Sequence, residues 1–484
     1  MGLRKNFIYN IIVTTSNYLF PFIVFPYVSR TLGVHNLGIC NFVDNVVLYF
    51  TMFSMMGMGI LGIREIAAVQ GNPIRTNQTF LSLFCLNGIF TMLSIISFLI
   101  CIAFIPQFHQ YQELMYIGCL NIAANFLLID WLYKGLEDFK YITKRTLTIK
   151  IIYVFAIFLF VRQKDDYIIY YALTTISVIL NALINILHSR KFINFKSSTL
   201  SISQYKKPYF KLGLYWISTT IYASFYTIIL GFVSTPDEIG YFTTASKLII
   251  LTMSLYTAWT TVAMPRSSAM LSNGETLNFL ELINKSFNAL FAFSIPIVII
   301  GIFFSHDIIF ILSGNGYEGA SIPSAILMPL IFIIGCSQIA VIQILMPKRC
   351  DTILLTNSII GAIVGLFLCY ILVPRFFAIG ASISWLMSET IVLILAMMFV
   401  QKNFNIHFPW KLYLTNLTGQ IPTIILCLIL FRGLTSFSPF SRLLIVCVSV
   451  FTYTLFLQYR IIKNPLIINI FTYTTSCLYN ILKK

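Results

Sequence analysis

Residues 6–67 read NFIYNIIVTTSNYLFPFIVFPYVSRTLGVHNLGICNFVDNVVLYFTMFSMMGMGILGIREIA. Two apolar segments make up this stretch, separated by a break at Gly38, and the second segment closes at Arg64. The pattern returns 202 positions later, where Gly240 is the counterpart of Gly38 and Arg266 is the counterpart of Arg64. A pair of helices repeated at this distance predicts that the chain contains two copies of one larger unit.

The composition indicates a membrane protein. Of the 484 residues, 58% are hydrophobic and only 10% are charged, whereas soluble domains carry about 25% charged residues. The net charge of +16 would favour nucleic-acid binding in a soluble protein. Here, however, the basic residues lie in short clusters between apolar runs of about 20 residues, the length that spans a bilayer. The ten cysteines form no CxxC pair, so we expect neither a metal site nor a cofactor.

Fourteen apolar segments are long enough to cross a membrane, and helices satisfy their own backbone hydrogen bonds there. The predicted fold class is therefore an all-α polytopic membrane protein with about fourteen transmembrane helices. The predicted spans are 7–30, 38–63, 79–105, 112–133, 146–161, 167–187, 210–233, 239–263, 286–305, 323–346, 352–373, 378–400, 412–431 and 441–459.

Lys and Arg predict the orientation, because cytoplasmic loops carry an excess of both. With both termini in the cytoplasm, the cytoplasmic tails, loops and helix ends hold 25 of the 32 basic residues. The opposite side holds six, and Lys247 lies inside a span. The six on the opposite side are Arg30, Arg162, Lys164, Arg375, Arg432 and Arg442.

Helices 1–6 and 7–12 are the predicted copies of the repeat. Because six is even, both copies start on the same side, so a pseudo-twofold axis along the membrane normal relates them. The linker between them is basic, and we expect it to lie on the cytoplasmic surface. The predicted domains are an N-lobe at 1–190, a cytoplasmic linker at 191–209, a C-lobe at 210–402, helices 13 and 14 at 403–463, and an interfacial tail at 464–484.

Short motifs in the first twelve helices carry a family resemblance. They are Phe25-Pro26-Tyr27-Val28-Ser29-Arg30-Thr31-Leu32-Gly33, Leu37-Gly38-Ile39-Cys40-Asn41-Phe42, Arg64-Glu65-Ile66-Ala67, Asp130-Trp131-Leu132-Tyr133-Lys134-Gly135-Leu136-Glu137, Val262-Ala263-Met264-Pro265-Arg266, Gln343-Ile344-Leu345-Met346-Pro347 and Ala378-Ile379-Gly380-Ala381-Ser382. The chain resembles the Wzx-type flippases of O-antigen and capsule repeat units, although the family usually has Gln at the position of Lys134. These flippases belong to the multidrug/oligosaccharidyl-lipid/polysaccharide exporter superfamily, which also holds the MATE drug exporters.

The resemblance implies two six-helix lobes around a cavity that opens alternately to each side of a bacterial inner membrane. The implied substrate is an undecaprenyl-diphosphate-linked oligosaccharide, moved from the cytoplasmic to the periplasmic leaflet. The implied partners are this substrate and membrane lipid, with a polysaccharide polymerase and chain-length proteins as further candidates. The loops are too short to hold a catalytic domain, so we expect a transporter and not an enzyme.

Three charged residues within the spans are candidates for coupling or gating. A charge near mid-bilayer costs about 2.5–3.5 kcal/mol on insertion scales. Glu389, deep in helix 12, is therefore either a carboxylate that couples transport to an H+ or Na+ gradient or a hydrogen-bonded structural group. Asp44 and Lys247 follow the two repeated glycines at similar distances. They either form an outer gate or are each satisfied within their own lobe.

Cations at helix ends are candidates for binding the diphosphate, because Arg and Lys pair naturally with phosphate. Positive-inside anchoring is the alternative for those on the cytoplasmic side. Arg30 lies at the outer end of helix 1, where topology disfavours a cation, and it is a candidate for binding the diphosphate on release. The cytoplasmic candidates are Arg64, Lys134, Lys144, Arg145, Arg266, Lys348 and Arg349.

Polar and aromatic residues within the spans are suited to sugars, although packing and interfacial belts also use such residues. Asn17 and Asp130 are the polar candidates for the cavity. Further residues of this kind are Asn121, Asn125, Tyr215, Trp216, Tyr222, Tyr226, Gln338 and Gln343.

Three other functions compete with an oligosaccharide flippase. A MATE-like drug or cation antiporter predicts acidic residues concentrated deep in one lobe, whereas the few acids within these spans are divided between the lobes. A lipid II flippase resembles this family but carries an arginine–aspartate pair in helix 1, where this chain reads Ile23-Val24-Phe25. A membrane polysaccharide polymerase requires a sizeable periplasmic loop, and the outward loops are short.

Overall fold

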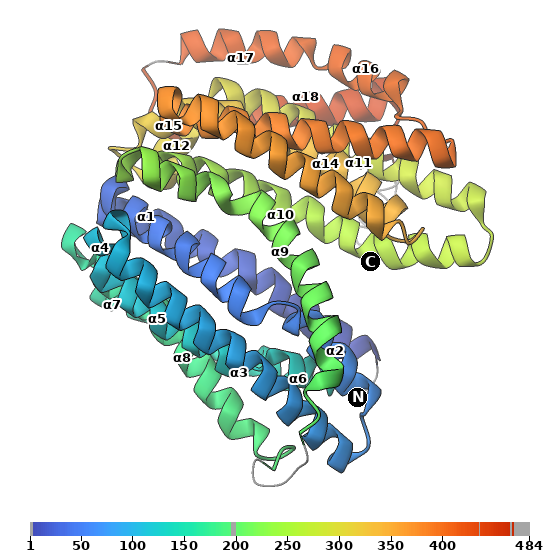
Figure 1. Cartoon of the computed structure of the whole chain (residues 1–484). Coiled ribbons are helices and arrows are strands. Elements are labelled where there is room, and N and C mark those ends of the chain that lie inside the picture. Colours follow the sequence, from blue (N-terminus) through green and yellow to red (C-terminus); the bar gives the residue numbers. More distant parts are fainter. Residues whose placement is uncertain (1–2, 195–199, 435, 465–466, 469–484) are drawn as a thin grey trace, which may run out of the picture. The chain divides into compact units, whose positions relative to one another are not determined.

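The computed structural model describes the chain except residues 1–2, 195–199, 435, 465–466 and 469–484. The described residues are helical and contain no strand, which confirms the predicted all-α fold class. Contacts divide the chain into two compact units, Met1–Gly240 and Tyr241–Lys484. Figure 1 colours the first unit from blue to green and the second from green to red.

Most helices of the first unit are long. Helix α1 packs against α3, α5 and α7, and α5 packs against α8. The helices are α1 (Leu3–Met55), α2 (Met58–Ala68), α3 (Pro73–Phe104), α4 (Pro106–Gln110), α5 (Gln112–Leu127), α6 (Asp130–Gly135), α7 (Phe139–Phe160), a short 3-10 turn (Lys164–Asp166), α8 (Tyr167–Ser189), α9 (Ser203–Val233) and the start of α10 (Pro236–Ser272).

In the second unit, α11 packs against α14 and α17, and α15 packs against α13 and α14. The helices that follow α10 are α11 (Thr276–Phe303), α12 (Ser305–Ser313), a 3-10 turn (Glu318–Ala320), α13 (Ser321–Leu327), α14 (Leu330–Gln338), a π-helix (Ile339–Leu345), α15 (Asp351–Phe404), α16 (Trp410–Gly419), α17 (Ile421–Gly433), α18 (Pro439–Phe456) and a second π-helix (Leu457–Ile461).

Nine helical stretches among the described residues are long and apolar enough to cross a membrane. These apolar stretches indicate a multi-pass membrane protein. Two of these stretches each contain two predicted spans, because α1 and α15 continue across kinks at Gly33 and Phe377. Gly33 has φ 76°, a left-handed conformation that glycine adopts without strain. The count of fourteen spans stays a prediction.

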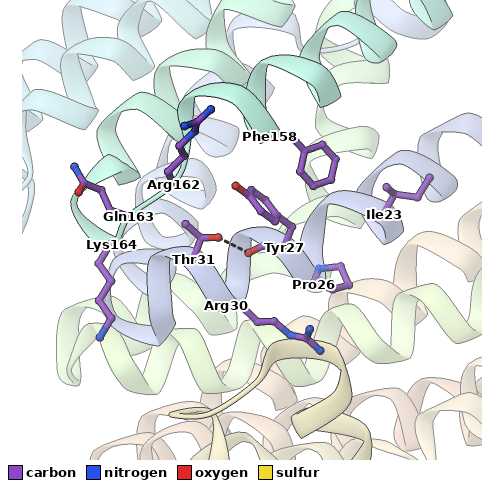
Figure 2. Close-up of a pocket in the computed structure, with 9 residues that line it drawn as sticks. All are labelled: Ile23, Pro26, Tyr27, Arg30, Thr31, Phe158, Arg162, Gln163 and Lys164. Atoms are coloured by element: carbon purple, nitrogen blue, oxygen red, sulfur yellow. Dashed lines mark hydrogen bonds between the residues drawn. The ribbon is translucent and has the colours of Figure 1, made fainter. Parts of the chain in front are cut away.

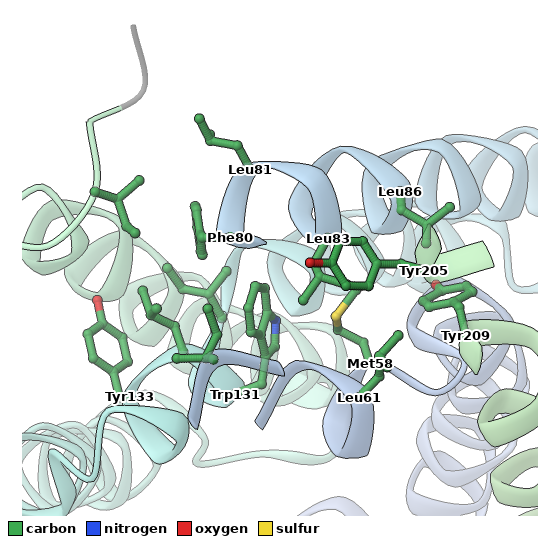
Figure 3. Packing of buried hydrophobic residues seen from close by; sticks show 14 of the residues in the cluster. Met58, Leu61, Phe80, Leu81, Leu83, Leu86, Trp131, Tyr133, Tyr205 and Tyr209 are labelled. Atoms are coloured by element: carbon green, nitrogen blue, oxygen red, sulfur yellow. The ribbon is translucent and has the colours of Figure 1, made fainter. Parts of the chain in front are cut away.

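A cluster of buried apolar side chains joins α2, α3, α6 and α9 within the first unit (Figure 3). Its centre is Trp131, whose ring stacks on Phe80 with 5.3 Å between the ring centroids. Gly62 of α2 also lies against this indole, and a Cβ there would come within 2.6 Å of the ring. The Asp-Trp-Leu-Tyr motif therefore serves packing through its tryptophan, whatever its other residues do.

The linker between the predicted lobes contributes to the same cluster. We expected a surface stretch there, but Tyr205 and Tyr209, in the first turns of α9, are buried. The Tyr209 hydroxyl lies 3.0 Å from the carbonyl oxygen of Ser54 and 3.1 Å from Oδ1 of Asn87. Apolar residues scattered in a basic segment therefore indicated docking onto the protein.

Replacing Tyr209 by Phe is expected to lower the free energy of unfolding by about 1–2 kcal/mol, because the single hydroxyl proton that two buried acceptors share is lost. Thermal unfolding in detergent measures this loss. Tyr370→Phe is the matched control, since Tyr370 is 81% exposed and its loss of a hydroxyl should leave the melting temperature unchanged. Equal melting temperatures for both variants would mean that the linker does not depend on this hydrogen bond.

The compact units do not coincide with the predicted lobes. Helix α9 belongs to the first unit because it packs against α1 and α2, whereas the repeat assigns it to the C-lobe. The repeat is a property of sequence and the units reflect contacts, so the lobe boundaries stay a prediction. Most of the predicted interfacial tail, 464–484, lies outside the described residues.

Candidate functional site

An open surface cavity of about 810 Å³ lies between α1 on one side and the end of α7 with its following loop on the other, within the first unit (Figure 2). Arg30 lines it from α1, and Arg162 and Lys164 line it from the loop after α7, with the charged ends of the three side chains pointing in different directions. The described lining therefore contains three cations, and it contains no acidic residue. The lining residues are Ile23, Pro26, Tyr27, Arg30, Thr31, Phe158, Arg162, Gln163 and Lys164.

Tyr27 attaches the two walls of this cavity to each other. Its hydroxyl donates to the carbonyl oxygen of Val161 over 2.7 Å, and its ring lies 4.5 Å from the ring of Phe158. Arg30 follows Tyr27 by three residues, and Gly33 ends the regular helix one turn later. These contacts place the arginine at the rim, where the helix stops.

The loop between α7 and α8 is held by its own hydrogen bonds. Asp166 accepts the backbone N–H groups of Arg162 at 2.8 Å and Gln163 at 3.0 Å. Asn36 of α1 donates its amide to the carbonyl oxygen of Lys164 at 2.7 Å. The nearby carboxylate is thus engaged with the backbone, and both loop cations present exposed side chains.

Two predicted site residues, Asp130 and Arg145, are brought together in a buried cluster. Arg145 Nη1 lies 2.9 Å from Asp130 Oδ1, and the arginine side chain is only 4% exposed. Asn185 of α8 donates to the same carboxylate oxygen at 2.9 Å and accepts from Arg145. Tyr141 donates to Oδ1 of Asn185 at 3.0 Å. The positive charge of Arg145 is neutralised by Asp130 and buried. The hydrogen bonds of Arg145 therefore hold α6, α7 and α8 together.

Asn17 is also paired, with a lysine that was not among the predicted site residues. Lys150 of α7 donates to Oδ1 of Asn17 at 2.6 Å and to Oγ of Ser16 at 3.1 Å. Its ammonium group lies 5.7 Å from the centroid of the Phe20 ring. Lys150 is thus held against α1 by uncharged side chains.

The other predicted cations lie at helix ends, and all except the half-buried Lys348 have exposed side chains. Arg64 is engaged with its neighbour Glu65, with 2.8 Å between Nη2 and Oε1. Lys134, Arg266 and Arg349 are exposed. Lys144 is exposed as well, and Lys348 lies 4.0 Å from the ring centroid of Phe404.

The coupling and gating candidates are distributed over both units. Glu389 is partly buried, and Trp385 donates its indole N–H to Oε1 of Glu389 at 3.4 Å. Asp44 lies in the first unit and Lys247 in the second. The gate between Asp44 and Lys247 therefore stays a prediction.

Two separate sets of hydrogen bonds in the second unit engage two of the residues considered for sugars. Gln338 donates to Oγ1 of Thr257 at 2.9 Å and accepts from Thr260 at 3.1 Å. Gln343 is fully buried within the π-helix and accepts from the Ser286 hydroxyl at 2.8 Å. Since π-helical turns often occur at functional sites, Gln343 marks the part of the second unit that mutagenesis should address first.

Sequence reasoning gave no binding role to Arg162, Lys164, Lys150 or Asn185. A signal existed for the first two, because they are cations on the side where the positive-inside rule disfavours cations. Lys150 also lies a turn inside a predicted span. No pattern pointed to Asn185, which resembles any other polar residue of a helix until α6, α7 and α8 are packed.

Comparisons with known proteins agree with this architecture. "Putative O-antigen transporter" proteins of Escherichia coli (strain K12) and Shigella dysenteriae are 25% and 24% identical to this chain over 406 residues. These matches cover 83% and 81% of this chain and 98% of each relative. Among solved structures, the lipid II flippase MurJ in an inward closed conformation matches with a TM-score of 0.76 at 14% identity, covering 94% of this chain and all of that one.

A MATE protein in a bent conformation has the same fold more distantly, with a TM-score of 0.53 at 13% identity over 84% of this chain and 95% of that one. At such identities these structures establish the fold alone. The family model described as polysaccharide biosynthesis protein matches residues 3–271, more than half of the sequence. The chain therefore belongs to the polysaccharide biosynthesis protein family.

Proposed function

We propose that this protein is a flippase that moves undecaprenyl-diphosphate-linked oligosaccharide repeat units from the cytoplasmic to the periplasmic leaflet. Membership of the family and the names of the two relatives support a role in O-antigen export. The proposal places the chain in a bacterial inner membrane with both termini in the cytoplasm. A polysaccharide polymerase and chain-length proteins are the proposed partners downstream.

The observation that carries this function is the sign of the charge in the cavity. Arg30, Arg162 and Lys164 make its described lining positive, and the lining offers no carboxylate to a cationic drug. Cations paired with phosphate form strong, charge-assisted hydrogen bonds. The cavity therefore favours an anionic amphiphile over the substrate of a drug or cation antiporter.

In alternating access, the substrate path must close on one side while it is open on the other. The contacts of the repeated glycines Gly38 and Gly240 support a closed gate on the proposed outer side. Within the first unit, a Cβ added at Gly38 would lie 2.7 Å from the carbonyl carbon of Pro236. A Cβ added at Gly240 would lie 2.5 Å from the carbonyl oxygen of Val34. The backbones of two repeat-equivalent helix starts thus touch. In the proposed cycle this glycine crossing is the closed outer gate.

In the proposed cycle an H+ or Na+ gradient biases the two states, with Glu389 as the coupling carboxylate. A partly buried carboxylate that accepts from Trp385 is able to change its hydrogen bonding when it binds a cation or proton. Glu389→Gln should then transport at the same rate with and without an ion gradient. A variant that keeps the gradient dependence of the wild type would return Glu389 to a structural role.

Deletion of the gene in its host tests the function itself. The expected result is an accumulation of prenyl-diphosphate-linked repeat units on the cytoplasmic face and a loss of surface polysaccharide, both reversed by the restored gene. Unchanged polysaccharide with altered drug tolerance would favour the antiporter. Accumulation of peptidoglycan precursor with cell lysis would identify a lipid II flippase.

A further inference from the structure

We propose that the two halves of α15 hold an anionic phospholipid of the cytoplasmic leaflet, with its phosphate at Lys402 and one of its ester carbonyls at Asn357. The site lies within the second unit, and its lipid is not the transported substrate. The inference does not depend on the proposed function, because it requires only that α15 crosses a membrane.

Helix α15 forms a hairpin. Its two halves meet at Phe377, where the backbone leaves helical geometry with φ 44°. The halves then pack side by side, because the Ser388 hydroxyl in the second half donates to the carbonyl oxygen of Gly361 in the first over 2.6 Å. The start and the end of α15 therefore lie on the same side, which is the predicted cytoplasmic side.

An open cavity of about 540 Å³ is lined by both halves of this hairpin toward its two ends. Asn357 lines it from the first half and Lys402 from the second, and the described lining contains no carboxylate. Most of the other lining residues are apolar, so the cavity suits a molecule that has both a polar and an apolar part. These apolar residues are Ile353, Leu395, Met398 and Phe399.

Asn357 has a buried amide that lacks a partner. The residue is only 8% exposed, and its Nδ2 has no hydrogen-bond acceptor among the described residues. Asn357 lies on the same buried face of the helix as Gly361, which contacts the second half. A buried donor without an acceptor costs free energy. Because Asn357 lines the cavity, a ligand held there is able to supply the missing acceptor.

The depth of Asn357 matches the ester carbonyls of a phospholipid. Asn357 follows Asp351, the first residue of α15, by six positions, which is about 9 Å along the helix axis. The headgroup region of one leaflet is roughly 5–8 Å thick. Asn357 therefore lies just below the phosphates when Asp351 is at the membrane surface. Ester carbonyls lie at this level, and they accept hydrogen bonds without donating any.

The charges at this end of the hairpin favour an anionic headgroup. Lys402 is exposed and lines the cavity, and Lys348 lies 4.0 Å from the ring centroid of Phe404 in the same end of the helix. The two lysines outnumber the neighbouring carboxylate of Asp351. Basic pockets between helices on the cytoplasmic side bind anionic headgroups. Phosphatidylglycerol has no cation of its own, whereas phosphatidylcholine carries one that Lys402 repels.

Native mass spectrometry of the full-length protein in detergent measures the Kd for phosphatidylglycerol and for phosphatidylcholine. K402Q is compared with K411Q, which removes an exposed lysine that does not line the cavity. N357L is compared with N403L, which removes an exposed asparagine from the same helix. Lys402 is exposed, so K402Q leaves the fold intact and tests the site even if N357L does not fold.

K402Q is expected to raise the Kd for phosphatidylglycerol about fivefold or more and to remove the preference for this lipid over phosphatidylcholine. N357L is expected to raise the Kd for both lipids about fivefold, because both have ester carbonyls. In detergent without added lipid, N357L should melt no lower than the wild type, since its amide has no partner in the protein to lose. K411Q and N403L should bind both lipids as the wild type does.

Wild-type affinity in both K402Q and N357L would overturn the site. Equal loss in K402Q and K411Q would also overturn it, because net charge alone would then explain binding. Soluble glycerol phosphate should not displace phosphatidylglycerol, and displacement would mean that the cavity binds free phosphates and not a lipid. These readouts do not involve transport, so a failed lipid site leaves the flippase standing, and a failed flippase leaves the lipid site standing.

Discussion

Arg145→Met is expected to lower the free energy of unfolding by about 3 kcal/mol, and with it the amount of protein in the membrane. Removing one partner of a buried ion pair costs about 3–5 kcal/mol because the other charge is left uncompensated. The lower end applies here, since the Asp130 side chain is 27% exposed and reaches some solvent. Asn185 would also lose the guanidinium that donates to it.

Thermal unfolding of the purified protein in detergent measures this effect. Arg64→Met is the control, because the Arg64–Glu65 pair is exposed and such pairs contribute about 0–1 kcal/mol. Adding Asp130→Asn to Arg145→Met should restore part of the stability, since no unpaired charge then remains. An Arg145→Met variant that melts like the wild type but exports nothing would instead place Arg145 on the substrate path.

The fold could be predicted because apolar run length and breaks are local properties of the sequence. The kink at Gly33 falls between the predicted spans 7–30 and 38–63, and the kink at Phe377 falls between 352–373 and 378–400. In both places the backbone leaves helical geometry at one residue, so the two expected helices meet at a kink and not across a loop.

The site was predicted less completely, because it depends on packing between distant segments. Arg145 and Asp130 were both chosen, but only the packing of α6, α7 and α8 brings them into a direct ion pair and adds Asn185 to it. Arg162 and Lys164 could have been found, since the positive-inside rule had already marked them as exceptions. Three cations that break the positive-inside rule line the cavity at α1, whereas none of those that follow the rule lies in its described lining.

Gly38→Ala is expected to reduce polysaccharide export at least tenfold while the protein still inserts. The added Cβ meets the backbone of Pro236, and backbone atoms cannot move aside as a flexible side chain does. Overpacking typically costs about 1–3 kcal/mol. If this clash destabilises only the closed state of the glycine crossing, by about 2 kcal/mol, the ratio of closed to open protein falls about thirtyfold.

Gly59→Ala provides the matched control, because a Cβ there meets no atom within 4 Å and the residue also lies in a helix. Gly240→Ala should repeat the defect, since its Cβ meets Val34 from the other side of the crossing.

Opening is measured with a cysteine at Val34, in a background whose native cysteines are replaced. The label is a membrane-impermeant maleimide applied from outside. Labelling should rise in Gly38→Ala and stay low in Gly59→Ala, because only the first substitution separates the two backbones. If both variants label and export alike, the glycine crossing does not close during transport, and the repeat-equivalent glycines serve packing alone.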